Sequence, residues 1–201
     1  MIKTNRAIVY RLYPNKKQAE LFQKTFGCVR FVYNQMLSVQ EERYKNNESH
    51  LSKFDMNLYC NHNLKTEYTW LKEVDKFALT NAMYHLEDGY QRMFKHLGNH
   101  PKYKNKHKAK KSYTTNFTNN NIEVGKNYIK LPKIGKVKAK ISFDTRCLRI
   151  KSATITQNRD ETYQVSILFE ITEEEPVQVI STESNTIGLD YKSDGLYVSD
   201  T

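Results

Sequence analysis

The sequence predicts an α+β fold in which a helical bundle adjoins a small antiparallel β-barrel. Two long segments, residues 15–44 and 75–97, carry apolar side chains at steps of three and four, which is the period of an amphipathic helix. Residues 7–13 and several segments between 128 and 171 instead alternate apolar and polar side chains, as strands with one buried face do. A small barrel is the natural way to close such a series of strands.

The first predicted elements are a short strand and a long helix. Residues 7–13, AIVYRLY, alternate and end at Pro14, which has no N–H for a sheet hydrogen bond. Asn15 follows and is a favourable N-cap residue, so we expect a helix from there to about Tyr44. Its buried stripe should consist of Ala19, Phe22, Phe26, Val29, Tyr33 and Met36.

A second helix is predicted over about residues 75–97, and the pairing of two apolar stripes indicates a small bundle. Residues 45–66, between the two helices, are polar and fit either a loop or a short helix. We interpret the apolar face of the second helix as core. This face consists of Ala78, Leu79, Ala82, Met83, Leu86, Tyr90, Met93, Phe94 and Leu97.

Positive charge is concentrated after the second helix. The 201 residues carry a formal net charge of +10, yet the stretch from Gly89 to Lys151 has 17 Lys and Arg against two acidic residues, for a local charge of +15. Dense basic surfaces bind polyanions through phosphate neutralisation and counterion release. We therefore expect a nucleic acid as partner and no membrane, because the chain shows no apolar anchor and no lipidation motif. The lysines expected to meet phosphates are Lys102, Lys104, Lys106, Lys108, Lys110 and Lys111.

The second half of the chain predicts strands joined by short turns. The expected strands are residues 128–131, 137–143, 150–157 and 163–171, with a hairpin turn at 158–161. An acidic linker over residues 173–186 should then lead into a final hairpin that turns at Asp194-Gly195.

The cysteines predict a reduced, cytoplasmic protein without a zinc site. Cys28, Cys60 and Cys147 are odd in number and far apart, with no C-x-x-C pair. Cys60 and His62 form a C-x-H, but no second ligand pair follows at zinc spacing. We interpret both residues as structural.

Six strings of residues, in order along nearly the whole chain, resemble the N-terminal half of TnpB (OrfB) proteins. These are transposon-encoded RNA-guided DNA nucleases related to type V CRISPR effectors. The strings are RLYPNKKQ at 11–18, FGCVRFVYNQML at 26–37, WLKEVDKFALTNAMYHLE at 70–87, SYTTNFTNNNIEVG at 112–125, IKLPKIGKVKAK at 129–140 and IGLD at 187–190.

The resemblance implies three domains. Residues 1–13 and 112–178 would form a wedge-like β-barrel, residues 14–111 an inserted helical recognition bundle, and residues 179–201 the first hairpin of a truncated RNase H-like (RuvC) domain.

Asp190 corresponds in this resemblance to the first catalytic carboxylate of the RuvC domain. The family uses several carboxylates to hold Mg²⁺ for phosphodiester hydrolysis, and such a two-metal site cannot be built from one. We therefore expect Mg²⁺ only in a complete RuvC domain, and no DNA cleavage by this chain alone.

The resemblance also implies partners and contact residues. Family members bind a structured guide RNA and recognise a short motif in double-stranded DNA, while base pairing reads the rest of the target. Lys76 and Thr80, one helical turn apart, are expected to face a DNA groove. The other residues that the resemblance assigns to nucleic-acid binding are Phe77, Asn81, Thr118 and Asn119.

Two alternatives to a guide-dependent nuclease fragment stay open. One is a stand-alone RNA- and DNA-binding repressor that does not cleave. The other is a DNA transposase, although neither a carboxylate triad nor a Tyr nucleophile with a paired-His motif is present in the sequence. A DNA-binding protein of either kind would be cytoplasmic and associated with the bacterial nucleoid.

Overall fold

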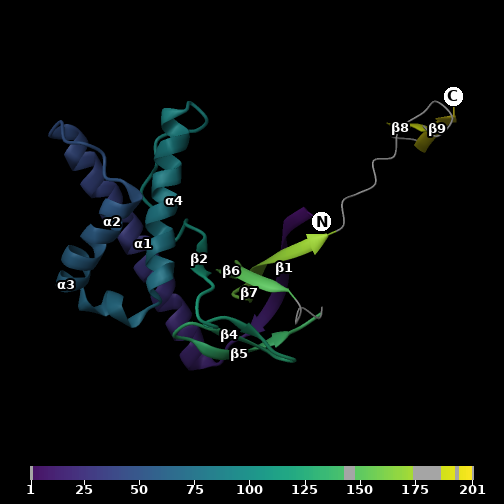
Figure 1. Ribbon diagram of the computed structural model, residues 1–201, viewed down its shortest axis with the longest axis horizontal. Coiled ribbons are helices and arrows are strands. Elements are labelled where there is room, and N and C mark those ends of the chain that lie inside the picture. The colour runs from purple at the N-terminus through teal and green to yellow at the C-terminus, as the bar shows by residue number, and fades with distance from the viewer. Residues whose placement is uncertain (1, 143–147, 174–186, 193–194, 201) are drawn as a thin grey trace. The chain divides into compact units, whose positions relative to one another are not determined.

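The computed structural model, shown in Figure 1, describes residues 2–142, 148–173, 187–192 and 195–200, with side chains described for 3–142 and 148–172. The chain separates into two compact units. One comprises residues 4–171, and the other comprises residues 1–3 and 172–201. The first unit contains all of the helices and the larger sheet, and is α+β as predicted.

The helices of the first unit form a bundle in which α1 packs along α4. Residues 45–66 contain short helices rather than a plain loop. The helical elements are α1 (Lys16–Lys45), α2 (Lys53–Tyr59), a π-helical turn (Cys60–Leu64), α3 (Lys65–Glu67), a 3₁₀ turn (Thr69–Glu73) and α4 (Lys76–Phe94).

Helix α1 begins where its N-cap was predicted. Asn15 accepts a hydrogen bond from the Gln18 backbone N–H at 2.9 Å, and the Gln18 side chain accepts one from the Asn15 N–H at 3.1 Å. This reciprocal capping box satisfies two donors that the first turn leaves unpaired. Below it the predicted stripe is buried from Phe22 to Met36, whereas Ala19 is only partly buried.

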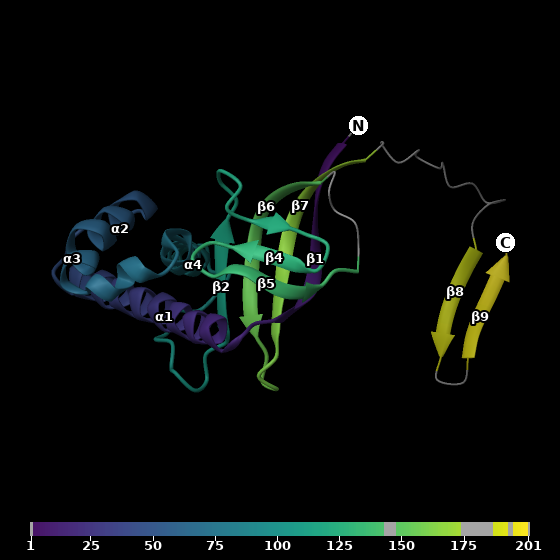
Figure 2. The ribbon, with the colours of Figure 1, turned by 90° about the horizontal axis from the view of Figure 1, so that it is seen from below.

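The strands form one seven-stranded sheet in the order β2-β6-β7-β1-β5-β4-β3. Figure 2 shows that the sheet curls, so that β4 and β5 cross over β6, β7 and β1 as in half of a barrel. The first strand thus lies centrally, between strands from the second half of the chain. The strands are β1 (Ile2–Tyr13), β2 (Lys111–Asn116), β3 (Glu123–Val124), β4 (Tyr128–Leu131), β5 (Gly135–Lys140), β6 (Arg149–Gln157) and β7 (Tyr163–Glu173).

Aromatic rings join α1 to the sheet. Phe22 stacks on Tyr163 of β7, with ring centroids 5.4 Å apart, and the Gln23 amide donates hydrogen bonds to Gln157 Oε1 and to the Tyr163 hydroxyl. Gln18 donates a further bond to the Lys136 carbonyl of β5. The first turns of α1 are therefore fixed on the sheet, and the orientation of the bundle follows from these contacts.

Some details of the sequence prediction were wrong. Helix α4 ends at Phe94 rather than near residue 97, and Phe94 and Leu97 are 56% and 67% exposed instead of belonging to the core. The helix ends early because His96 adopts a left-handed backbone conformation, and the His96 and Leu97 N–H groups bond back to the carbonyls of Met93 and Arg92. Strands β2 and β3 were not predicted as strands.

The second unit contains a two-stranded antiparallel hairpin of β8 (Ile187–Lys192) and β9 (Gly195–Asp200). Asp190 lies on β8, opposite Tyr197. The predicted acidic linker and the first residue of the predicted turn lie outside the described residues, except for the start of the linker in β7. The correspondence to a RuvC hairpin stays a prediction, as does the division into three domains.

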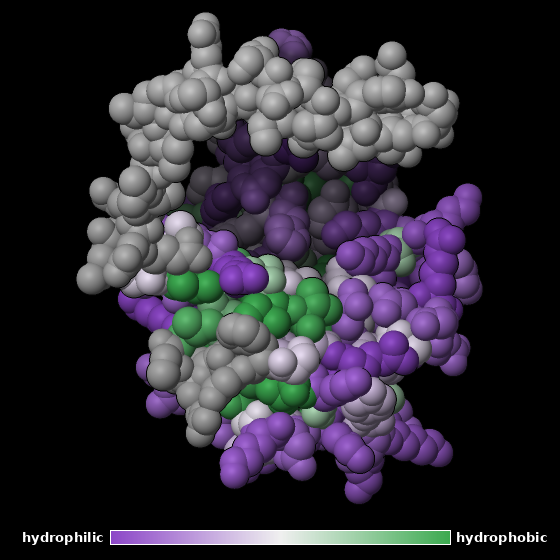
Figure 3. Space-filling model, turned by 90° about the vertical axis from the view of Figure 1, so that its right-hand side faces the viewer, coloured by the Kyte–Doolittle hydropathy of each residue, from purple (hydrophilic) through white to green (hydrophobic). Residues whose placement is uncertain are grey.

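Hydrophilic side chains dominate the face drawn in Figure 3, with hydrophobic side chains gathered toward its middle. This distribution agrees with a chain in which 27% of residues are charged. Among the residues that the structure describes, no helix is long and apolar enough to span a membrane.

Candidate functional site

A groove of about 510 Å³ lies at the N-terminal end of α4, and we refer to it as the α4 groove. It brings together four of the residues predicted from sequence. The described residues that line it are Lys65, Leu71, Lys72, Val74, Asp75, Lys76, Phe77, Thr118, Asn119, Asn121, Pro132 and Lys133. Lys76 and Phe77 come from the first turn of α4, and Thr118 and Asn119 from the loop after β2.

The loop after β2 is shaped by its asparagines. The Asn121 side chain accepts a hydrogen bond from the Thr118 N–H at 2.8 Å and donates one to the Asn116 carbonyl at 3.0 Å. Asn119 and Asn120 adopt positive φ angles of 49° and 55°, a conformation that asparagine tolerates better than most residues. These bonds hold Thr118 and Asn119 at the surface, where both are exposed.

Asn81 sets the position of α4 against this loop. Its side-chain amide donates to the Phe77 carbonyl at 2.9 Å, to the Thr114 carbonyl of β2 at 3.0 Å, and to Asn116 Oδ1 at 3.3 Å. A half-buried amide with these partners serves as a link between helix and strand. It also explains why Lys76 and Thr118 share one groove.

Thr80 does not line the α4 groove. Its hydroxyl donates to Asn57 Oδ1 of α2 at 3.1 Å, and Asn57 in turn donates to the Lys53 carbonyl and to the Tyr84 hydroxyl. Thr80 therefore faces α2, although it lies one turn from Lys76 as the sequence indicated. A role for Thr80 in nucleic-acid contact stays a prediction.

Lysines surround the α4 groove, whereas its carboxylate is buried. Lys65, Lys72 and Lys133 join Lys76 in the lining; the first three were not predicted, because only the folded chain brings them to one place. Asp75 is 7% exposed, and its Oδ2 has no hydrogen-bond partner among the described residues. Asp75 occupies the N-cap position of α4, yet its side chain makes no capping bond. The exposed charge of the groove is therefore positive.

The buried Asp75 carboxylate also acts on its surroundings. Burial, and secondarily the Asp75 charge, raise the pKa of Tyr113 on β2 well above its ordinary value. Tyr113 therefore stays neutral and packs against Phe22 and Phe26 of α1.

The lysine-rich segment 99–110 has no helix or strand, but its first part is anchored. Pro101 lies against Gly89 of α4, where a side-chain carbon on the glycine would approach Pro101 Cγ to 3.3 Å. Asn34 of α1 exchanges two hydrogen bonds with the Lys104 backbone, at 2.8 and 3.1 Å. The predicted lysines beyond this anchor, and Lys102 within it, are exposed; they are Lys102, Lys106, Lys108, Lys110 and Lys111.

Lys104 differs from its neighbours because it is half-buried. Its ammonium lies 3.8 Å from the centroid of the Tyr33 ring, a cation–π contact, and burial lowers its pKa. No carboxylate forms an ion pair with it among the described residues. Lys104 lines a cleft of about 310 Å³ between α4 and β2, which we call the lysine cleft, together with Asn81, His85, Lys110, Ser112, Thr114 and Thr154.

Cys60 and His62 do not form part of a metal cluster in the part of the chain that is described. No group of three or more His, Cys, Asp or Glu side chains gathers there in a way that could hold a metal ion. Cys60 is buried, and burial raises the pKa of its thiol. Asp190 is not among the residues whose side chains the structure describes.

A family model described as a helix-turn-helix domain of OrfB proteins matches residues 1–49. In the structure, this range contains the strand β1 and the single uninterrupted helix α1. The two helices that the description implies are absent from the described residues 2–49, so a helix-turn-helix DNA contact cannot be read from this match.

Two relatives match about half of the chain. One, from Streptomyces pristinaespiralis, bears a name that describes it as an RNA-guided DNA endonuclease, and is 32% identical over 113 residues. This match covers 56% of the present chain and 28% of the relative. The other, virulence protein VsdF of Salmonella dublin, is 30% identical over 112 residues, which cover 51% of the present chain and 94% of VsdF.

Proposed function

Because the chain belongs to the TnpB (OrfB) family, we propose that it binds a structured guide RNA and a short motif in double-stranded DNA. The observation that carries this proposal is the α4 groove, where Lys76, Phe77, Thr118 and Asn119 meet in a ring of lysines. The chain spans 28% of the length of the endonuclease relative. For the present chain we therefore propose only the binding of nucleic acid, and not the endonuclease activity in that relative's name.

The α4 groove has the chemistry of a duplex-binding surface. Lys76 can donate to base edges or phosphates, and the amide and hydroxyl of Asn119 and Thr118 suit either target. The Lys76 ammonium lies 5.0 Å from the centroid of the Phe77 ring. A cation and an apolar ring therefore adjoin each other in the groove. The other lysines of the groove, Lys65, Lys72 and Lys133, would neutralise phosphates on both sides of the contact.

Thr80 and Asn81 take positioning roles in this proposal. The Asn81 amide donates its hydrogen bonds to residues of α4 and β2, and the Thr80 hydroxyl donates one to Asn57. Both side chains therefore fix α4, and the direct contacts fall to the four residues in the groove.

The lysine segment and the lysine cleft suit an RNA backbone. Exposed lysines from Lys106 to Lys111 follow one another at close spacing on an irregular segment, which can adapt to a folded RNA. Lys104 is a partly desolvated cation that has no carboxylate partner in the described part of the chain. A phosphate in the lysine cleft would supply the missing negative charge, with His85, Ser112 and Thr154 as further hydrogen-bonding groups.

We propose binding without cleavage for these 201 residues. A two-metal site requires several convergent carboxylates, and the described side chains contain no such group. In a complete RuvC domain, Asp190 would be one ligand of Mg²⁺. Binding without cleavage is common to a nuclease fragment and to a repressor, so the proposal holds for both.

A selection experiment tests the proposal. Protein co-purified with its RNA would be incubated with duplexes that carry a randomised segment, and bound duplexes would be sequenced. We expect one short motif to be enriched, and the double variant Lys76→Ala with Thr118→Ala to lose most of this enrichment while RNA affinity changes little. One lost base contact typically weakens discrimination by about 1 to 3 kcal/mol. Recovery of random RNA and absence of any enriched motif would contradict the proposal.

A further inference from the structure

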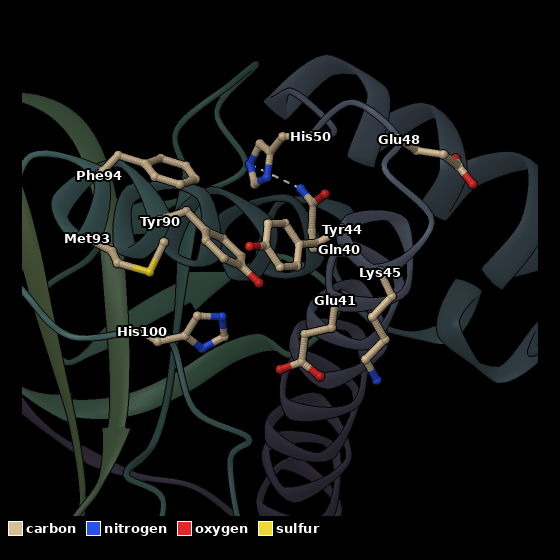
Figure 4. A pocket seen from close by; sticks show the side chains of 10 residues that line it. All are labelled: Gln40, Glu41, Tyr44, Lys45, Glu48, His50, Tyr90, Met93, Phe94 and His100. Carbon is tan, nitrogen blue, oxygen red and sulfur yellow. Dashed lines mark hydrogen bonds between the residues drawn. The ribbon is translucent and has the colours of Figure 1, made fainter.

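A third cavity, which the sequence did not indicate, lies between the C-terminal ends of α1 and α4. We call it the aromatic pocket; it has a volume of about 520 Å³. Figure 4 shows five rings from different elements around this one space. They belong to Tyr44 of α1, Tyr90 and Phe94 of α4, and His50 and His100 of the segments that follow these helices.

The rings on the inner side of the pocket are held in place by one another. Tyr90, 5% exposed, makes edge contacts with His50 at 4.9 Å and His100 at 5.5 Å between centroids, and stacks near Phe94 at 6.1 Å. Such tilted and offset arrangements are the favourable geometries for aromatic pairs. The inner wall of the pocket is therefore built from aromatic rings that pack on one another.

The rings at the rim are exposed instead. Tyr44 is 84% exposed and Phe94 is 56% exposed, although packing them in the core would have stabilised the fold. Exposed aromatic rings that border a cavity mark binding surfaces more often than isolated apolar residues do. The pocket thus offers open ring faces to a planar ligand.

Hydrogen bonds stabilise the polar wall of the pocket. His50 Nε2 lies 2.7 Å from Glu87 Oε2 and 3.2 Å from the amide nitrogen of Gln40, and Gln40 also bonds twice to the Leu51 backbone. From the side chains that the structure describes, Glu41 accepts one hydrogen bond, donated by the Tyr103 hydroxyl at 2.8 Å. Because a carboxylate has about four acceptor positions, Glu41 can accept further donors from a ligand.

The charge around the pocket fits a phosphate backbone. Lys45 lines it, and Arg92, Lys95 and Lys102 are exposed on the adjoining ends of α4 and the following segment. The negative charge of Glu48 is matched by Arg43, at 2.7 Å. A ligand with a planar ring, a hydrogen-bond donor and an anionic chain therefore meets complementary groups.

We propose that the aromatic pocket binds an unpaired nucleobase of single-stranded RNA, and that it favours a base with an exocyclic amine. The base would stack on Tyr44 and Phe94, its amine would donate to Glu41, and the flanking phosphates would lie near Lys45 and Lys95. Unstacked bases on aromatic side chains are the usual mode of sequence-dependent RNA recognition. This inference rests on the proposed RNA binding, but concerns a site separate from the α4 groove and the lysine cleft.

The test is a titration of the whole chain, freed of RNA, with short labelled oligo(A) and oligo(U), followed by fluorescence anisotropy. Oligo(A) should bind about tenfold more tightly than oligo(U), which lacks an exocyclic amine. Tyr44→Ala and Phe94→Ala should each weaken oligo(A) binding about tenfold, as expected for the loss of one stacking contact. Tyr44→Phe should retain the affinity of the unmodified chain. Because Tyr44 and Phe94 are exposed, these variants should fold.

Phe54→Ala is the matched control, since Phe54 is 72% exposed on α2 and does not line the pocket; its RNA affinity should not change. If Tyr44→Ala and Phe94→Ala bind oligo(A) as tightly as the unmodified chain does, this inference is overturned, while the proposed function stays intact. Absence of all RNA binding would overturn both. Self-association that is lost in these variants, without an effect on RNA, would identify a protein interface instead.

Discussion

Lys76 and Thr118 line the same groove, although one begins helix α4 and the other lies in the loop after strand β2. The link between them is Asn81, whose amide bonds both the helix and the strand. The geometry of the α4 groove therefore depends on a residue that does not line it.

Substitution of Asn81 should change the geometry of the α4 groove, although Asn81 does not line it. Asn81→Ala removes three hydrogen bonds and leaves the Thr114 carbonyl and Asn116 Oδ1 without this donor, so the free energy of unfolding should fall by about 1 to 3 kcal/mol. Discrimination of the DNA motif should weaken more than RNA affinity. Urea unfolding and the duplex selection measure the two effects. Gln91→Ala, which removes a hydrogen bond to Glu87 near the other end of the same helix, is the control; an equal loss of motif discrimination in both variants would argue against a linking role for Asn81.

Asp75 should be replaceable with a gain in stability. Its buried Oδ2 has no partner among the described residues, and it does not cap α4. Asp75→Ser removes the buried charge and introduces a good N-cap side chain, so the free energy of unfolding should rise by about 1 kcal/mol. A lower urea midpoint for the variant would show that the carboxylate has a stabilising partner after all.

Alkaline pH should destabilise the fold through buried acids. Burial raises the pKa of Cys28 from 9.0 to about 11 and that of Tyr90 from 10.0 to about 12. Because folding favours the neutral forms, their contribution to stability is present below pH 9 and is lost as the pH rises toward 12. Tyr90→Phe should therefore flatten the loss between pH 10 and 12, on the order of 2 kcal/mol. Tyr44→Phe, at an exposed ring, should leave the profile of the unmodified chain unchanged, and an unaltered Tyr90→Phe profile would refute the assignment.

Asp190 should be silent in the 201-residue polypeptide. One carboxylate cannot assemble a two-metal site, so we expect no Mg²⁺-dependent DNA cleavage, and Asp190→Ala should leave RNA affinity unchanged. The unmodified chain and the Asp190→Ala variant would each be incubated with guide RNA, matched duplex DNA and Mg²⁺, and DNA cleavage would be compared. Cleavage abolished by Asp190→Ala would mean that the remaining ligands come from another polypeptide.

Much of the fold was predictable because its local signals are strong. Asn15 caps α1, the stripe from Phe22 to Met36 is buried, and β4 spans the predicted residues. The failures have physical causes. Strand β2 has few apolar residues and is defined by its pairing with β6 over residues 111–116, which no local pattern reveals. Phe94 and Leu97 continue the apolar period of α4 in the sequence. The helix ends at Phe94, however, and both side chains are exposed.

The candidate site was predictable only in part. The resemblance pointed to Lys76, Phe77, Thr118 and Asn119, and the fold brings all four to one groove. The added lysines, such as Lys133 in the β4–β5 turn, carry no local signal and gather only through the tertiary structure. The half-buried state of Lys104 likewise arises from its contact with Tyr33 and its backbone hydrogen bonds to Asn34, since the nearest lysines in the sequence, Lys102 and Lys106, are exposed.

Mapping where nucleic acids touch the chain tests the central claim most directly. Photo-crosslinking of bound RNA and of motif-bearing duplex DNA, followed by mass spectrometry of the peptides, would locate both contacts in one experiment. We expect DNA crosslinks in peptides that contain Lys76 and Phe77 or Thr118 and Asn119, and RNA crosslinks in peptides from residues 100–111. DNA crosslinks confined to α2, or to the face of β1 and β7, with none in the α4 groove, would contradict the account.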